Sequence, residues 1–172
     1  MANHKLLVPY IQKWEGGFVN DPADRGGATM AGVTIATYTE YCRKKGLPAP
    51  TIDDLKKITE AEWMDIFKTL YWDRWQADKI LSQSIANILV DWVWGSGVWG
   101  IKIPQRILGV VEDGIAGQKT LIALNSRPPR LLFDEIKKAR VKYIDDICKK
   151  TPTNEKFRRG WMNRLNDLKF ES

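Results

Sequence analysis

The chain has 172 residues, of which 44% are hydrophobic and 28% are charged, with only 8 prolines. This length and composition predict one compact domain, or two small packed ones, that folds without a disulfide or a metal, and they exclude a disordered or collagenous chain. The formal net charge of +6 and the 8 tryptophans favour an anionic polymer as partner, an aromatic-lined binding groove, or both.

Short-range features exclude further classes of protein. No run of apolar residues approaches the ~18 needed to span a bilayer, so stable membrane insertion is not expected. The first residues, from Met1 to Lys5, contain no signal-peptide core, so we expect synthesis in the cytoplasm and a separate release route for work outside it. Cys42, Cys148 and the single histidine, His4, have no metal-binding spacing. We therefore expect a solvated His4, no metal, no cofactor and no histidine-dependent catalytic triad.

The predicted elements are mostly helices. Apolar residues at 6, 7, 10, 11 and 14 predict a first helix that ends at Gly16, with Pro9 requiring a late start or a kink. The residues from Phe18 to Ile35 are rich in Gly, Asp and Thr and predict a loop with a small hairpin. Thr59 and Glu62 form a capping box that opens the next helix.

Three more helices are expected farther along the chain. A stripe over 85–92 predicts a helix buried on one side, and a long helix follows Pro128-Pro129. Asn154 is the expected N-cap of the last helix. The charge divides near a Gly-Ser-Gly joint: residues 1–98 have a net charge of −1 and residues 99–172 a net charge of +7. The fold class is therefore mainly α with one small β-hairpin, in two regions, 1–97 and 98–172.

Two carboxyl groups carry the candidate chemistry. Glu15 ends the first helix beside Trp14, where the helix C-terminus and an apolar neighbour are expected to raise its pKa. A carboxylic acid that stays protonated near neutral pH can protonate a glycosidic oxygen. Asp24, in a polar loop, is expected to be ionised, and such a contrast is typical of glycoside hydrolysis. Thr29 and Thr34 are candidates for positioning a water or bonding the second carboxylate, although a helix end and an ordinary turn explain the same pattern.

The segment WEGGFVNDPADRGGATMAGVT, from Trp14 to Thr34, resembles the signature of glycoside hydrolase family 108, the N-acetylmuramidases of bacteria and their phages. The resemblance places that family's catalytic acid on Glu15. The order Glu, Asp, Thr is also similar to phage-type lysozymes, which implies Asp24 as the second carboxylate and Thr29 or Thr34 as the third member. The resemblance also implies a lysozyme-like helical fold with the hairpin near the active site.

The resemblance continues through Tyr71-Trp72-Asp73 and Asp91-Trp92, and it implies a substrate contact at Asp91. Trp94 stands where relatives often carry asparagine. With Trp99 it flanks the Gly-Ser-Gly joint, and both offer flat faces to sugar rings. Three other tryptophans lie on apolar stripes and are expected in the core: Trp63, Trp92 and Trp161.

The C-terminal part resembles the predicted peptidoglycan domain that usually follows this catalytic region. Its Asp113-Gly114 pair predicts a tight turn, and Gly117 predicts a close backbone approach before a short helix. Two interpretations stay open: the motif is a packing device, or it binds the cell wall. The basic pairs in this part are expected on solvated helix faces that attract the negatively charged envelope.

The sequence thus predicts a monomeric muramidase that hydrolyses the β-1,4 bond between N-acetylmuramic acid and N-acetylglucosamine in bacterial peptidoglycan. Glu15 is the expected general acid, and Asp24 stabilises the transition state or helps to activate water. By family analogy, holin-type release would bring the chain to the wall. The alternative is a non-catalytic peptidoglycan-binding module. A nucleic-acid partner is not expected, because no zinc finger, RNA-recognition signature or phosphate loop is present. Inverting and retaining chemistry both stay open.

Overall fold

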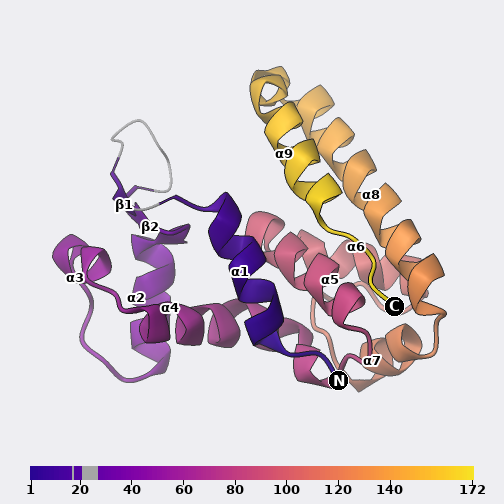
Figure 1. Cartoon of the computed structure of the whole chain (residues 1–172), viewed down its shortest axis with the longest axis horizontal. Coiled ribbons are helices and arrows are strands. Elements are labelled where there is room, and N and C mark those ends of the chain that lie inside the picture. Colours follow the sequence, from indigo (N-terminus) through magenta and orange to yellow (C-terminus); the bar gives the residue numbers. More distant parts are fainter. Residues whose placement is uncertain (17, 21–26) are drawn as a thin grey trace. The chain divides into compact units, whose positions relative to one another are not determined.

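The computed structural model describes residues 1–16, 18–20 and 27–172. Its contacts divide the chain into an N-terminal unit, His4–Asp73, and a C-terminal unit, Arg74–Ser172, which also takes up Met1–Asn3. Helices predominate in both units, and the small antiparallel sheet belongs to the N-terminal unit (Figure 1). The prediction of a mainly α fold with one small β element is confirmed.

The N-terminal unit begins with a helix that runs through a proline. Its elements are α1 (His4–Trp14), β1 (Phe18–Val19), β2 (Thr29–Met30), β3 (Val33–Thr34), α2 (Ile35–Lys44), α3 (Ile52–Lys56), α4 (Glu60–Phe67) and the π-helical turn η1 (Lys68–Trp72). Helix α1 starts at His4, so of the two alternatives for Pro9 the late start is wrong, and the kink stays a prediction. Burial of Leu7, Val8 and Ile11 stabilises the helix although the proline removes a hydrogen bond.

The sheet has the strand order β1-β2-β3, all antiparallel, so β2 lies in the centre. The register aligns Thr29 with Thr34 and leaves only Ala31 and Gly32 as the turn. Their φ angles are 47° and 84°, and two positive values are what a type I′ hairpin requires. The predicted hairpin is confirmed, and β1 adds a third strand.

The C-terminal unit is built around one almost fully buried helix. Its elements are the short turns η2 (Asp73–Trp75, which begins at the last residue of the N-terminal unit), η3 (Ala77–Lys79) and η4 (Pro152–Asn154), with α5 (Gln83–Ser96), α6 (Trp99–Leu108), α7 (Gln118–Asn125), α8 (Pro129–Lys150) and α9 (Glu155–Asp167). Helix α5 packs on α6 and α8 and buries nearly every residue from Ser84 to Val93, more than the expected single face. At Gly100 an added Cβ would lie 2.6 Å from the Val93 backbone nitrogen, so α6 approaches α5 very closely.

One local prediction in the C-terminal unit is wrong, and another is only partly confirmed. Gly117 has open space around it, whereas a Cβ on Gly114 would lie 2.6 Å from Val98 Cγ2, so the close approach belongs to Gly114. Asn154 is the N-cap residue of α9, as expected, but its side chain makes no capping hydrogen bond. The reason is that η4 leads directly into α9, so Asn154 has helical rather than extended backbone angles.

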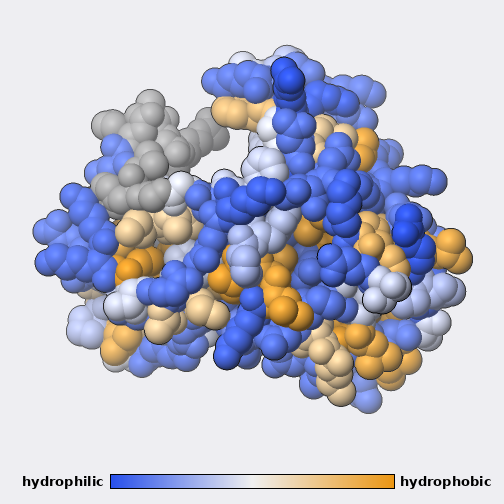
Figure 2. Space-filling model, viewed as in Figure 1, coloured by the Kyte–Doolittle hydropathy of each residue, from blue (hydrophilic) through white to orange (hydrophobic). Residues whose placement is uncertain are grey.

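The contact boundary at 73/74 differs from the expected boundary at 97/98. Because a sequence region and a packing unit need not coincide, the expected regions stay a prediction. On the face shown in Figure 2, hydrophilic residues cover most of the surface and apolar ones form separate patches. Within the described ranges, no helix is long and apolar enough to cross a membrane.

Candidate functional site

Glu15 follows α1 directly, and its side chain is half-buried. Its backbone N–H donates to the Gln12 carbonyl at 3.2 Å, which tightens the last turn of the helix. The Gln12 side chain in turn donates to Glu60 Oε1 at 2.6 Å. The end of α1, and with it the backbone of Glu15, is therefore tied to the first residue of α4.

Helix α4 also holds the hairpin. Trp63 is 2% exposed, and its indole N–H donates to the Ala31 carbonyl at 3.1 Å. Because Ala31 is one of the two turn residues, this bond fixes the tip of the β2–β3 hairpin. One helix thus anchors both the segment that carries Glu15 and the hairpin that carries the two candidate threonines.

Thr34 serves as the N-cap of α2. Its hydroxyl oxygen accepts a hydrogen bond from the Thr37 N–H at 3.0 Å, and its O–H donates to the Thr37 hydroxyl oxygen at 2.9 Å. The Thr37 hydroxyl lies 3.5 Å from the hydroxyl of Tyr71 in η1. Tyr71 stacks on Phe67, and Phe67 stacks on Trp63, whose indole bonds the hairpin tip. The base of the hairpin is linked to the same row of rings through Thr37. The hydroxyl of Thr34 is therefore used for folding.

Thr29 lies directly opposite Thr34 in the sheet, so the two side chains share one face. It is half-buried in the central strand, and its hydroxyl forms no side-chain hydrogen bond with the residues that the structure describes. The structure thus brings the two predicted threonines together and gives them different surroundings. The predicted second carboxylate, Asp24, lies outside the described residues.

Two phenols join α2 to α4. Tyr38 donates to Glu62 Oε2 at 3.3 Å, and Tyr41 donates to Asp65 Oδ2 at 2.5 Å. Burial, followed by the negative charge of Glu62, raises the pKa of Tyr38 to about 12. Burial and the bond to Asp65 raise the pKa of Tyr41, and that same bond lowers the pKa of Asp65. Both contacts stabilise α4 as the support of the candidate site.

His4, Cys42 and Cys148 do not form a metal site. His4 packs edge-on against Trp72, with 6.0 Å between ring centroids, so the expectation of a merely solvated side chain is wrong. Both cysteines are buried free thiols. In the part of the chain that the structure describes, no three His, Cys, Asp or Glu residues are grouped so that they could hold a metal ion.

The predicted sugar-contacting residues belong to the C-terminal unit. Trp94 is half-buried in α5. Trp99, the first residue of α6, is 46% exposed, and Lys102 Nζ lies 5.5 Å from the centroid of its ring. Trp63 and Trp92 are buried as expected, whereas Trp161 is only half-buried.

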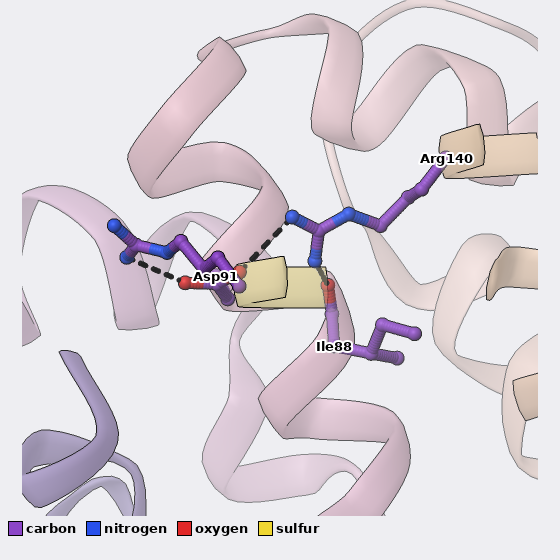
Figure 3. Close-up of polar contacts among 4 residues, drawn as sticks. Ile88, Asp91 and Arg140 are labelled. Atoms are coloured by element: carbon purple, nitrogen blue, oxygen red, sulfur yellow. Dashed lines mark hydrogen bonds and ion pairs between the residues drawn. The ribbon is translucent and has the colours of Figure 1, made fainter. Parts of the chain in front are cut away.

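Asp91 is buried between two arginines. Its side chain is fully buried; Oδ2 accepts from Arg140 at 3.0 Å and Oδ1 accepts from Arg164 at 2.8 Å. Figure 3 shows the Arg140 guanidinium between Asp91 and the backbone carbonyl of Ile88, to which it donates at 3.1 Å. Asp91 thus joins α5 to α8 and α9, and both of its oxygens are engaged by protein groups. A direct substrate contact at Asp91 stays a prediction from the family resemblance.

Sequence reasoning missed both arginines, although the sequence contains a signal for them. Arg140 lies four residues from Ile136 and four from Ile144, on the apolar stripe of its helix. Arg164 likewise lies three residues after Trp161 and four before Leu168, both of which belong to the apolar stripe predicted for its helix. A cation within an apolar stripe indicates a buried anionic partner.

The C-terminal motif forms a network of its own. Gln105 is fully buried; its amide group donates to Asp113 Oδ1 at 2.9 Å and accepts from the Gly114 N–H at 2.9 Å. The Ile115 N–H also donates to Asp113 Oδ1. The hydrogen bonds from Ile115 and from Gln105 lower the pKa of the Asp113 carboxyl group. These contacts give the motif a packing role, and wall binding by the same residues stays a prediction.

The chain matches two known families. Residues 8–97 match the family described as glycosyl hydrolase 108, and residues 99–166 match the one described as predicted peptidoglycan domain. Twelve chains of solved structures match, among them SagA of Brucella abortus. SagA is 28% identical, with a TM-score of 0.81 over 95% of this chain and 90% of that one. A comparison with curated proteins gave no match.

The first match covers more than half of the chain and contains the described candidate residues Glu15, Thr29 and Thr34. The likeness to SagA extends over both units and confirms the lysozyme-like, mainly α fold class. The second match supports peptidoglycan as the partner. The chain therefore belongs to the glycosyl hydrolase 108 family and is a glycoside hydrolase that acts on peptidoglycan.

Proposed function

We propose that the protein is an N-acetylmuramidase that hydrolyses the β-1,4 bond between N-acetylmuramic acid and N-acetylglucosamine, with Glu15 as the general acid. The observation that carries the proposal is the common anchoring by α4. Gln12 bonds Glu60 one turn before Glu15, and Trp63 bonds the turn of the hairpin that carries Thr29. A catalytic acid must be held in place to act on one bond, and rigid elements provide that support.

In the proposed reaction, Glu15 donates its proton to the glycosidic oxygen as the bond from that oxygen to the anomeric carbon breaks. The leaving sugar departs as an alcohol, and positive charge develops on the remaining ring. Asp24 is proposed as the carboxylate that stabilises this charge or helps to activate the water. Both products then carry hydroxyl groups, so the balance is the addition of one water.

We further propose Thr29 rather than Thr34 as the third member of the site. Thr34 uses its hydroxyl to cap α2, whereas Thr29 shares the same face of the sheet without a side-chain bond to the described residues. A hydroxyl in that position can hold a water or bond a carboxylate. We also propose that the protein acts as a monomeric, bacteriolytic endolysin, after synthesis in the cytoplasm and holin-type release to the wall.

The test is Glu15→Gln, which keeps the shape of the side chain and removes its acidity. The variant should fold normally and release almost no reducing ends from purified peptidoglycan. Glu40→Gln is the matched control: it changes an exposed glutamate of the same unit, paired only with Arg43 in the described contacts, and should keep full activity. Near-full activity of Glu15→Gln would contradict the assignment.

Mass spectrometry of the digest identifies the bond. Muramic acid at the new reducing end confirms a muramidase, and glucosamine at that end contradicts it. If the unmodified protein is pulled down by wall fragments but releases no reducing ends at all, the alternative of a binding module is favoured.

A further inference from the structure

Helices α8 and α9 pack against each other as a helical hairpin, and η4 joins them at one end. We call the twelve residues at that end, 149–160, the α8–α9 tip. In Figure 1 this tip lies at the top of the view, away from α5, α6 and α7 of the same unit. It contains five Lys or Arg residues and one glutamate, a net charge of +4. More than half of the charge of +7 on residues 99–172 is therefore gathered at the end of one helical hairpin.

The acidic side chains at the tip and in the preceding turn of α8 already have cationic partners. Asp145 forms an ion pair with Arg158, whose Nε also lies 3.9 Å from Glu155 Oε1. Asp146 pairs with Lys142 at 2.7 Å. The other cations of the tip are exposed and form no ion pair with the residues that the structure describes: Lys149, Lys150, Lys156 and Arg159. The tip thus presents an uncompensated positive charge to its surroundings, and this charge favours an anionic partner.

An exposed aromatic ring lies among these cations. Phe157 is 48% exposed, and Lys156 Nζ lies 5.0 Å from the centroid of its ring. One turn farther along α9, the half-buried Trp161 packs against Phe157 with 5.7 Å between ring centroids, which holds the phenyl ring in place. Lysine and arginine beside a phenylalanine are typical of helices that lie on a membrane surface. There the ring reaches the acyl chains, while the cationic groups stay with the headgroups.

We propose that the α8–α9 tip is a docking surface for an anionic lipid leaflet, to which it attaches the protein reversibly. The four exposed cations bind lipid phosphates, and Phe157 enters the boundary between headgroups and acyl chains. Each basic side chain at such a surface strengthens binding about fivefold. A polyanion without an apolar layer would pair with the cations but leave the phenyl ring in water, so charge and ring together favour the lipid. No residue of the tip belongs to the candidate catalytic site, so the inference is independent of the proposed function.

Binding is measured by co-sedimentation of the full chain with lipid vesicles, in which phosphatidylglycerol provides the anionic headgroup. Vesicles of phosphatidylglycerol and phosphatidylcholine in equal parts should bind the chain about 100-fold more tightly than vesicles of phosphatidylcholine alone. In about 1 M salt most of this difference should disappear, because the screening length falls to about 3 Å. Equal binding to both types of vesicle, or binding to neither, would overturn the proposal.

A matched pair of double variants tests whether the charge acts at the tip. Lys149→Gln/Lys150→Gln removes two of its exposed cations and should weaken binding to the anionic vesicles about 25-fold. Lys119→Gln/Lys138→Gln is the control, because it removes the same charge at two exposed positions of the same unit outside the tip. The control should bind nearly as well as the parent. Equal loss of binding in the two variants would show that only the total charge matters, and it would overturn the assignment to the tip.

A second matched pair tests the ring. Phe157→Gln keeps a good helix former and removes the phenyl group, so binding to the anionic vesicles should weaken about five- to tenfold. Ile122→Gln, at an exposed apolar residue of α7, is the control and should bind normally. Normal vesicle binding by Phe157→Gln would overturn the lipid proposal; tight binding of inorganic polyphosphate would then assign a general polyanion surface instead.

The melting temperature of each variant shows whether it is folded, and the comparison of the two types of vesicle needs only the unmodified chain. A variant that fails to fold therefore leaves the main test intact. None of these probes contains peptidoglycan, so failure of vesicle binding and failure of the reducing-end assay are distinguishable.

Discussion

The two threonines of the hairpin can be separated by their structural roles. Replacing Thr34 with alanine removes the acceptor of the Thr37 N–H and the bond between the two hydroxyls. Loss of an N-cap costs about 1 kcal/mol, and the hydroxyl pair adds about 0.5 to 1 kcal/mol. At ~2 to 4 °C per kcal/mol for a chain of this size, the melting temperature of Thr34→Ala should fall by about 3 to 8 °C.

Asparagine is a good N-cap without a hydroxyl, so Thr34→Asn should recover most of the lost stability and keep activity. Thr29→Val keeps a β-branched side chain in the central strand and removes its hydroxyl. Its melting temperature should change little, while turnover falls about 100-fold if the hydroxyl positions the water or the second carboxylate. Calorimetry and reducing-end release on the same preparations measure both effects. If Thr34→Asn were as inactive as Thr29→Val, or Thr34→Ala were as stable as the parent, the division of roles would be refuted.

Three further predictions concern local packing, two of them at supports of the candidate site and one in the C-terminal unit. Trp63→Phe puts a smaller aromatic ring in place of the indole and leaves the Ala31 carbonyl without its donor. The free energy of unfolding should therefore drop by at least about 1 to 2 kcal/mol in denaturant titrations, and turnover should drop with it. The pKa of Tyr38, raised from 10.0 to about 12, predicts a stability contribution that is complete below pH 10 and lost as the pH rises toward 12; Tyr38→Phe should flatten this slope. Gly114→Ala places a Cβ 2.6 Å from Val98 at a φ of +74°, so it should destabilise the chain by about 1 to 3 kcal/mol, and an unchanged melting temperature would contradict the close approach.

Regular helices were predictable because their signals are local. The Thr59 cap and the long helix after Pro128 depend on residues three to four positions apart, and both were found. Trp72 and Trp75 have no helical period in the sequence, yet both are fully buried. Trp72 is the last residue of a π-helical turn, and Trp75 is the last residue of a 3-10 turn. Neither type of turn has 3.6 residues per turn, so an α-helical pattern cannot reveal the burial of these two tryptophans.

The site was predictable only in part, for a related reason. Glu15 and the hairpin belong to one short segment, so their proximity in sequence pointed to a common role. Which threonine caps α2 depends on backbone angles that the sequence does not state. Asp91 meets Arg140 and Arg164 across 49 and 73 residues, and no spacing rule joins residues so far apart. Only the unusual place of each arginine on an apolar stripe hinted at such a partner.

Helix α5 has a consequence for how this architecture can be divided or exchanged. The hydrolase family match ends at residue 97, just after α5, yet α5 packs against α6 and α8 of the following segment. A fragment cut at the family junction would expose a helix that is buried on nearly every side and would leave Asp91 without either arginine. The segment that matches the hydrolase family is therefore not expected to fold independently of the segment that follows it. A chimera that exchanges the C-terminal unit must place its junction before α5, near residue 73, and must transplant the first three residues together with that unit.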